Sequence, residues 1–324
     1  MMDDAAPLLE VTDLHVLHHR AGGSVALVDG ISFQIGRGEI FGLVGESGSG
    51  KSISALATVR LLADGISATG TVKLKGQDLM GLSEAAMRGV RGGQISMIFQ
   101  EPAAALNPVF TIGSQIIAAI RAHLPLGKAA ARARAIELLR EVGIPDPANR
   151  LGFYPHQLSG GMCQRVMIAM ALAGGARLVI ADEPTTALDV TIQAEIVRLL
   201  ERLVRQTGIG LLFISHDLGL VARLCDRLAV AYAGEIVETG DTATLLRAPM
   251  HPYMQGLVKC VADFDNIGAL RGGIPGTPPL PGAWPDGCRF QARCEFATAG
   301  CERRQALRAI APGHQVRCWR AGTL

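Results

Sequence analysis

Residues 40–52 read Ile-Phe-Gly-Leu-Val-Gly-Glu-Ser-Gly-Ser-Gly-Lys-Ser, a short apolar run followed by a glycine-rich loop and a lysine. The run 40–44 suits a buried parallel strand, and the residues from Lys51 towards Leu62 read as a helix. The loop 45–52 fits the pattern G-x-x-x-x-G-K-[ST], in which glycines let backbone N–H groups curl around phosphates. Strand, loop and helix in this order predict a phosphate-binding loop.

Each residue of this loop has a predicted role. Lys51 is expected to reach the β- and γ-phosphates of a nucleotide, and the Ser52 hydroxyl to ligate Mg²⁺. The helix that begins there points its positive end at the anion. The rest of the phosphate cradle is expected from Gly45, Glu46, Ser47, Gly48, Ser49 and Gly50. A chance match is the alternative in a chain with 39 glycines, but the flanking strand and helix argue against it.

A second apolar strand, 178–181, ends in the carboxylates of Asp182 and Glu183. Asp182 is expected to hold Mg²⁺, directly or through water, and Glu183 to polarise the attacking water. In-line attack on a γ-phosphate needs an oriented water and charge compensation. Taken singly, an Asp-Glu pair after a strand is more often the start of a loop, so the interpretation depends on the phosphate loop.

Between these segments, Leu158-Ser159-Gly160-Gly161-Met162 opens a helix, with Ser159 as its N-cap. Alone it would read as a simple capped helix. In this order with the other two segments, it resembles the signature of ATP-binding cassettes. In that family the serine and glycines contact the γ-phosphate of ATP bound to the opposite subunit. The resemblance therefore implies ATP held between two cassettes.

Further marks of the family follow in order along the chain. Gln100 matches the glutamine loop that senses Mg²⁺ and the attacking water, and His216 matches the switch histidine that contacts the γ-phosphate. Ala187-Leu188-Asp189 matches the loop that crosses the dimer interface. His18 aligns roughly with the aromatic residue that stacks on adenine. An ordinary polar loop around His18 is an equally good interpretation.

The repeated strand-then-helix units predict an α/β fold with a largely parallel core. An antiparallel β region is expected at 8–40, and a helical insert at about 106–172. Within the insert, 129–142 reads as a helix with Ile136, Leu139 and Val142 on one face. The cassette is expected to span 8–240. Of the eight prolines in residues 241–324, seven interrupt the stretch 249–285, which predicts a loop-rich C-terminal extension.

The extension resembles that of oligopeptide/dipeptide and nickel importer ATPases. The resemblance lies in residues 247–257, 274–279 and 287–288, and also in 100–108 after the glutamine loop. Five of the seven cysteines fall in residues 241–324, and four of them crowd towards its end: Cys288, Cys294, Cys301 and Cys318. In some of these ATPases a matching quartet holds a [4Fe-4S] cluster. Four thiolates suit iron–sulfur or zinc, and four small buried apolar side chains are the alternative.

Bulk composition agrees with a cytosolic protein. The net charge of +2 gives no support for nucleic-acid binding, and no apolar run reaches the roughly 18 residues of a membrane helix. The N-terminus lacks the basic region of a secretory signal. The chain is therefore expected to stay in the cytosol, and the resemblance to importer ATPases implies a peripheral position on the cytoplasmic face of the bacterial inner membrane.

The resemblance also implies partners and a function. The partners are a second ATPase subunit, expected to be a paralogue, two membrane permeases and an external solute-binding protein. The function is ATP hydrolysis that powers uptake of dipeptides or oligopeptides. Nickel or another small solute is an alternative cargo, and a cassette ATPase without a transport role is the remaining alternative. The latter class usually carries coiled-coil inserts, zinc hooks or two cassettes, which this sequence lacks.

Overall fold

The computed structural model describes residues 6–186, 188–265 and 273–323. These residues form two compact units. The first unit contains the described residues of 1–35, 40–80 and 214–324, and the second contains those of 36–39 and 81–213. Each unit thus gathers segments that are distant in the sequence.

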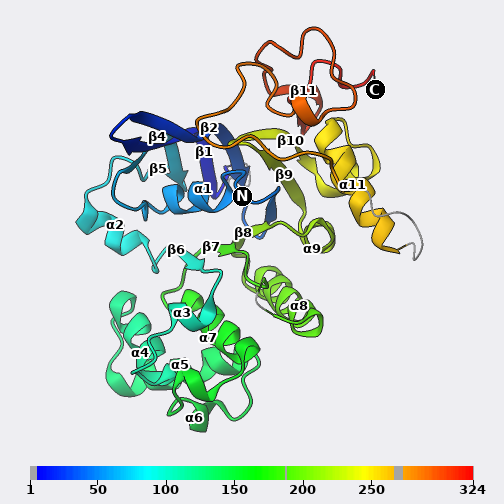
Figure 1. The fold of residues 1–324 in the computed structure, drawn as a ribbon. Coiled ribbons are helices and arrows are strands. Elements are labelled where there is room, and N and C mark those ends of the chain that lie inside the picture. Colours follow the sequence, from blue (N-terminus) through cyan, green and yellow to red (C-terminus); the bar gives the residue numbers. More distant parts are fainter. Residues whose placement is uncertain (1–5, 187, 266–272, 324) are drawn as a thin grey trace. The chain divides into compact units, whose positions relative to one another are not determined.

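The first unit contains a four-stranded antiparallel sheet with the strand order β2-β1-β4-β5 (Figure 1). Leu14, Val16 and Ile31 are fully buried, as the alternating pattern of the N-terminal region requires. The antiparallel β region predicted at 8–40 is confirmed, and β4 completes it. The strands are β1 (Leu9–Arg20), β2 (Gly23–Ile35), β4 (Ile66–Leu74) and β5 (Gln77–Asp78).

A second group of strands in the first unit has the order β11-β12-β10-β9-β3. Strand β3 runs parallel to β9, whereas β9 and β10 form an antiparallel hairpin that turns at Ala233-Gly234. All five residues of β3 are buried, which explains its uninterrupted apolar sequence. The strands are β3 (Ile40–Val44), β9 (Arg227–Tyr232), β10 (Glu235–Asp241), β11 (Arg308–Ala311) and β12 (His314–Val316).

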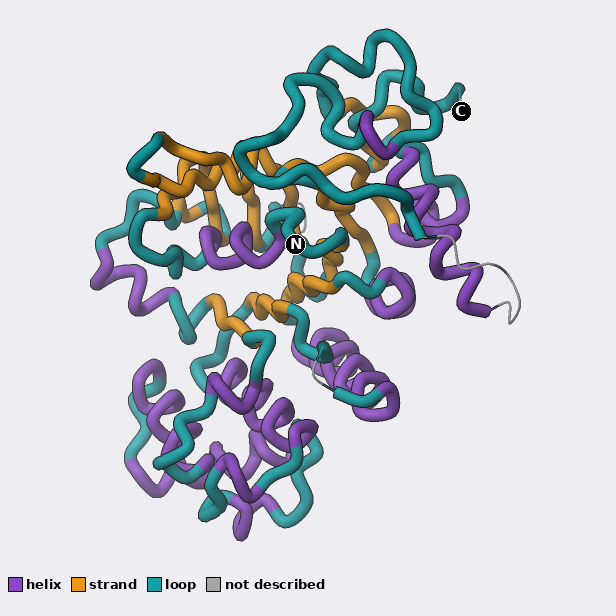
Figure 2. The backbone as a smooth tube through the Cα atoms, viewed as in Figure 1, coloured by secondary structure: helices purple, strands orange, loops and turns teal. Residues whose placement is uncertain are grey.

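The C-terminal extension contains more regular structure than its prolines predict. A 14-residue helix begins at Pro252, and β12 pairs antiparallel with β10. Pro252 is tolerated because the first turn of a helix needs no N–H donor there. The rest of the extension is largely loop (Figure 2). The helices of this unit are α1 (Lys51–Thr58), α9 (Leu218–Leu224), α10 (Thr242–Arg247), α11 (Pro252–Asp265) and the 3₁₀ helix η2 (Gln291–Arg293).

The second unit combines a parallel strand pair with a helical cluster. Strand β6 pairs with β7 through the register Ile95↔Leu178. Helices α3, α4 and α5 pack against α7, so the helices predicted at 106–172 are present (Figure 1). The elements are α2 (Glu84–Val90), β6 (Ile95–Ile98), α3 (Pro102–Ala105), α4 (Ile112–His123), α5 (Lys128–Glu141), α6 (Pro147–Arg150), η1 (Pro155–Gln157), α7 (Gly160–Leu172), β7 (Leu178–Asp182) and α8 (Val190–Thr207). Strand β8 (Gly210–Ser215) begins in this unit and ends in the first.

The buried face of α5 is partly as predicted. Leu139 and Val142 are fully buried, but Ile136 is only half-buried, and Ala131, Ala135 and Leu138 complete the inward face. Small alanines allow close approach of neighbouring helices, so the largest side chains do not alone define the face.

Among the described residues, no helix is long and apolar enough to cross a membrane.

Candidate functional site

The phosphate loop between β3 and α1 requires glycine at both ends. Gly45 has φ +158°, and a Cβ atom there would lie 2.1 Å from the carbonyl oxygen of Ala231. Gly50, the N-cap of α1, has φ +97° and lies against the carbonyl oxygen of Leu27. A side chain at Gly45 would clash with the backbone, and one at Gly50 would strain it. The loop therefore passes close to neighbouring backbone, as a phosphate cradle must.

Lys51 is buried at the start of α1, with only 4% of its surface exposed. Its ammonium group donates hydrogen bonds to the carbonyl oxygens of Gly45 (2.7 Å) and Glu46 (2.9 Å). The lysine thus lies along the inner side of the loop. Ser52 follows in the first turn of the helix. This geometry agrees with the predicted roles of both residues and does not test them.

In the second unit, the parallel pair β6 and β7 brings Gln100 close to the carboxylates. The Gln100 amide donates to Glu183 Oε2 at 3.4 Å. Glu183 has φ +45°, a left-handed conformation that is uncommon for a residue other than glycine. Asp182, the last residue of β7, is 7% exposed. The strand ends therefore gather three of the predicted site residues.

Thr186 is a residue of this cluster that the sequence did not single out. Its hydroxyl donates to Glu183 Oε2 at 2.9 Å, so it fixes the carboxylate from the loop that follows. The only sequence signal is a hydroxyl three residues after the glutamate, a spacing too common to identify a role.

Ser159 is the N-cap of α7, where its hydroxyl oxygen accepts a hydrogen bond from the Met162 N–H at 3.3 Å. Ser159 and Gly160 are both exposed. A Cβ atom on Gly161 would lie 2.8 Å from Ile192 in α8, so this glycine permits close packing of the two helices. The exposed helix start leaves backbone donors available to an anion.

Asp189 caps α8 in the same way, because its side chain accepts from the Ile192 N–H at 3.0 Å. It is exposed and lies beside the signature helix, since Leu188 and Ile192 are the residues nearest to Gly160 and Gly161. Ala187, the first residue of the predicted interface loop, lies outside the described residues. The two predicted interface motifs therefore form one exposed region of the second unit.

His216 is exposed at the end of β8 in the first unit, and Asp217 behind it caps α9. His18 lies half-buried on β1, where its Nδ1 accepts from Arg20 Nε at 3.2 Å. By contrast, His19 is held by two serine hydroxyls, and His15 is within hydrogen-bonding distance of two carboxylates. The role of His18 in binding adenine stays a prediction.

Cys288, Cys294, Cys301 and Cys318 of the extension line one cavity, together with Phe290 and His251. Burial raises the pKa of the Cys288 thiol to about 12 and also raises the pKa of the Cys294 and Cys318 thiols. The indole N–H of Trp319 donates to Cys301 Sγ at 3.4 Å. Among the described residues, no three His, Cys, Asp or Glu side chains are close enough to hold a single metal ion. The donor set is thiol-rich, but it does not form a ready mononuclear site.

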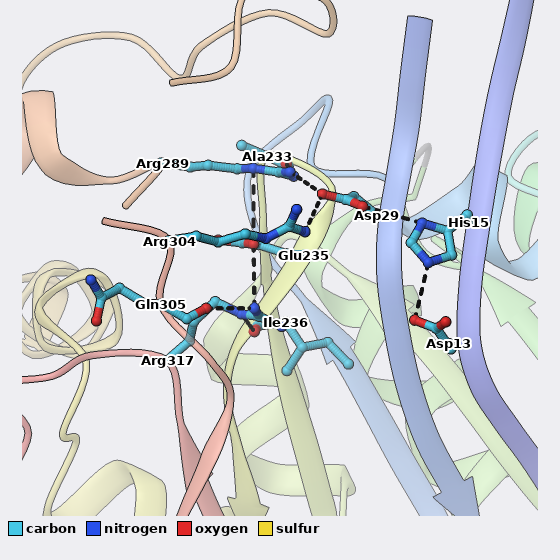
Figure 3. A network of polar contacts seen from close by, with 10 residues as sticks. All are labelled: Asp13, His15, Asp29, Ala233, Glu235, Ile236, Arg289, Arg304, Gln305 and Arg317. Atoms are coloured by element: carbon cyan, nitrogen blue, oxygen red, sulfur yellow. Dashed lines mark hydrogen bonds and ion pairs between the residues drawn. The ribbon is translucent and has the colours of Figure 1, made fainter. Parts of the chain in front are cut away.

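The extension is anchored to β2 and to the β9–β10 hairpin by arginines (Figure 3). Arg289 donates to the carbonyl oxygen of Ala233 at 2.6 Å and also pairs with Asp29, which Arg304 approaches to 2.5 Å. Arg317 donates to the carbonyl oxygen of Ile236 at 2.9 Å. Burial alone would raise the pKa of Asp29, but the two neighbouring guanidinium groups outweigh it and lower that pKa. The hairpin reaches the phosphate loop, because the Gly234 N–H donates to the Ser49 carbonyl at 3.1 Å.

Comparisons with known families agree with this geometry. Residues 28–186 match the ABC transporter family, and residues 237–301 match the family described as oligopeptide/dipeptide transporter, C-terminal region. The two matches fall on the phosphate-loop region and on the extension.

Two curated relatives align over nearly their full length. The dipeptide transport ATP-binding protein DppD of Escherichia coli is 46% identical over 313 residues, which is 96% of this chain and 96% of the relative. DppD of Bacillus subtilis is 46% identical over 96% of this chain and 94% of the relative. Among solved structures, a dimeric bacterial ABC transporter cassette superposes with a TM-score of 0.64 over 72% of this chain and 98% of its own. That structure is 24% identical and supports the fold alone.

Proposed function

The chain belongs to the ABC transporter family, as an ATPase of its oligopeptide/dipeptide branch, and on this premise we propose that it powers bacterial uptake of dipeptides or oligopeptides. The observation that supports this most is the alignment with dipeptide transport ATP-binding proteins across 96% of the chain, extension included. The same machinery for nickel or another small solute is the second candidate cargo.

ATP binding is assigned to the phosphate loop 45–52, with Lys51 on the β- and γ-phosphates. The burial of the Lys51 ammonium inside the loop supports this assignment. His18 is proposed to lie against the adenine. Ser52, Asp182 and Gln100 would hold Mg²⁺, which neutralises phosphate charge when bound. Their hydroxyl, carboxylate and amide oxygens are the hard ligands that this ion prefers.

Hydrolysis is assigned to three side chains around the γ-phosphate. Glu183 would orient and polarise the attacking water, assisted by Gln100, which already contacts its carboxylate. His216 would contact the γ-phosphate and stabilise charge that develops during transfer. The cassette is proposed to span 8–240, with helical insert 106–172, and the extension 241–324.

The region formed by the exposed Ser159, Gly160 and Asp189 and the half-buried Gly161 is proposed to complete the nucleotide site of a second ATPase subunit. Exposed backbone donors at the start of α7, with no assigned ligand in their own unit, support this role. The second subunit is expected to be a paralogue. Two permeases and an external solute-binding protein would complete the importer, at the cytoplasmic face of the inner membrane.

The cysteine quartet is proposed to hold a [4Fe-4S] cluster, with zinc as the alternative. Four thiols lining one cavity support a thiophilic group, because thiolates are the ligands that both prefer. The role would be structural, and no step of hydrolysis passes through it.

Anaerobic purification tests this group directly. Iron and acid-labile sulfide with broad visible absorption would support the cluster. A colourless protein with stoichiometric zinc would support the alternative, and a protein with neither would remove the proposal.

The transport proposal is tested in the bacterium that carries the gene. Deletion should abolish growth on a dipeptide that supplies a required amino acid, while the free amino acids still support growth. The wild-type gene should restore growth on the dipeptide, whereas a Glu183→Gln gene should not. Normal dipeptide uptake with loss of nickel uptake in the deletion strain would move the assignment to the second cargo.

A further inference from the structure

Glu46 places a carboxylate inside a loop that is built to bind a polyanion. Its side chain is 27% exposed and belongs to the second residue of the phosphate loop. A free negative charge here would repel the phosphates of ATP, since both lie in a partly desolvated site. Something must offset this charge for the loop to bind ATP well.

The compensating charge comes from the C-terminal extension, 247 residues further along the chain. Arg293 donates to both carboxylate oxygens of Glu46, at 2.8 Å and 3.0 Å, in a bidentate pair. The Arg293 side chain is only 5% exposed. Burial alone would lower the pKa of Arg293, but its bonds to Glu46 outweigh this and raise it. Arg293 and Glu46 therefore form a bidentate ion pair that is largely shielded from solvent.

The extension itself holds Arg293 in position. Its guanidinium group also donates to the carbonyl oxygens of Pro275 (2.9 Å) and Ile274 (3.1 Å). Tyr253 adds a second contact to the loop, because its hydroxyl oxygen accepts the Glu46 N–H at 2.9 Å. The Tyr253 ring packs against Phe290, whose centroid lies 5.4 Å away. Side chain and backbone of Glu46 are thus both fixed from the extension.

We propose that Arg293 and Tyr253 are positioning residues for ATP binding, so that the extension is a working part of the nucleotide site. Arg293 neutralises Glu46, and Tyr253 holds the first turn of the phosphate loop in its binding shape. This inference rests on the assignment of ATP to residues 45–52. It predicts that the extension affects the affinity for ATP through charge, beyond any effect on folding.

Removal of one charge, and then of both charges, in the full-length chain tests the charge argument. The Kd for ATP is measured by equilibrium dialysis with radiolabelled ATP. Arg293→Gln leaves the Glu46 carboxylate unpaired beside the phosphates, so the Kd for ATP should rise about tenfold. Glu46→Gln combined with Arg293→Gln removes both charges and should return the Kd to within about twofold of wild type. Arg293→Lys keeps the positive charge without the bidentate geometry, so its Kd for ATP should fall between those of wild type and Arg293→Gln.

Lys259→Gln is the matched control, because Lys259 is a cation of the same extension that pairs with Glu295 at 3.4 Å and is 66% exposed. It should leave the Kd for ATP unchanged. An unchanged Kd in Arg293→Gln would overturn the inference. So would an equal loss of affinity in Arg293→Gln and in the double variant, since that would indicate damage to the fold.

Tyr253→Phe separates the second contact. It keeps the buried ring and removes the hydroxyl that accepts the Glu46 N–H, so the Kd should rise about three- to tenfold with little change in melting temperature. No change in Kd would remove Tyr253 from the inference. Failure of the wild-type chain to bind ATP would instead count against the proposed function, which keeps the two questions apart.

Discussion

At the scale of single residues, Glu183 combines an unusual backbone with two side-chain contacts. Its φ of +45° costs energy for a residue with a Cβ atom, and hydrogen bonds from Gln100 and Thr186 hold its carboxylate. Such strain persists only where surrounding contacts maintain it. The left-handed backbone and the two hydrogen bonds therefore fix the position of the Glu183 carboxylate at the end of β7.

Glu183→Gln should reduce ATP turnover by about 100-fold or more, because the amide cannot polarise the attacking water. ATP binding should be retained, so nucleotide would remain trapped. Phosphate release and bound nucleotide measured on the same sample check both parts. Thr186→Val is the milder companion, with a turnover lowered severalfold and an unchanged Kd. Wild-type turnover in Glu183→Gln would remove the glutamate from the mechanism.

Asp29 gives a prediction for pH. The two arginines lower its folded-state pKa below the ordinary value of 3.8, so the unfolded chain takes up a proton first as the pH falls. The stability that Asp29 contributes is therefore present above about pH 4 and is lost as the pH falls through the folded pKa. Asp29→Asn should lower the unfolding free energy by about 2 kcal/mol at pH 7.

Melting curves of wild type and Asp29→Asn between pH 7 and pH 3 measure this difference. The gap in melting temperature should shrink towards the acidic end. A gap that stays constant over this range would show that the ion pairs with Arg289 and Arg304 contribute little.

At the scale of elements, the sequence predicted those helices and strands for which the hydrophobic periodicity and the flanking turn residues indicate the same element. The strand–loop–helix unit that begins at Ile40 and helix α7 after Ser159 both occur as expected, although α1 ends at Thr58 and not near the predicted Leu62. Predictions failed where packing decides. The inward face of α5 uses small alanines that carry little hydrophobic signal, and α11 begins with a proline that reads as an interruption. The buried face of α5 and the start of α11 are both set by tertiary packing as well as by the local sequence.

The loop between β3 and α1 allows a matched pair of glycine substitutions. Gly45→Ala would place a Cβ atom 2.1 Å from the Ala231 carbonyl oxygen, whereas a Cβ on Gly48 meets nothing within 4 Å. Both glycines have positive φ, so both changes add backbone strain. The clash adds to that strain only at Gly45.

Gly45→Ala should therefore destabilise the protein by about 3 kcal/mol and Gly48→Ala by about 1 kcal/mol. Thermal unfolding of the two variants at one pH gives the comparison. Equal melting temperatures would mean that the neighbouring strand yields easily, and the need for glycine at Gly45 would then lie in ATP binding alone.

At the scale of the whole molecule, the extension shows what a sequence cannot convey. The resemblance to the importer family identified residues 247–257 and the four cysteines, but not the partners of Arg293 or Arg289. Ion pairs across more than 240 positions, such as Glu46–Arg293 and Asp29–Arg289, depend on the completed fold. The motifs of the nucleotide site could be found because each is a short continuous segment. The contacts that position the phosphate loop join residues far apart in the sequence, so the sequence did not predict them.

The dependence of hydrolysis on a second subunit is the last prediction. Ser159 is exposed at the start of α7 and is assigned to the nucleotide of the partner, while Lys51 is buried in the chain's own phosphate loop. Ser159→Arg should therefore leave ATP binding by the isolated chain unchanged and strongly reduce turnover by the assembled importer, whether the partner is identical or a paralogue. Lys51→Ala should weaken ATP binding by the isolated chain about tenfold or more, since it removes a charge from the phosphates. Equilibrium dialysis on the chain and phosphate release from the complex separate the two effects. Full turnover by a dilute, monomeric Ser159→Arg chain would show that one subunit contains a complete hydrolytic site.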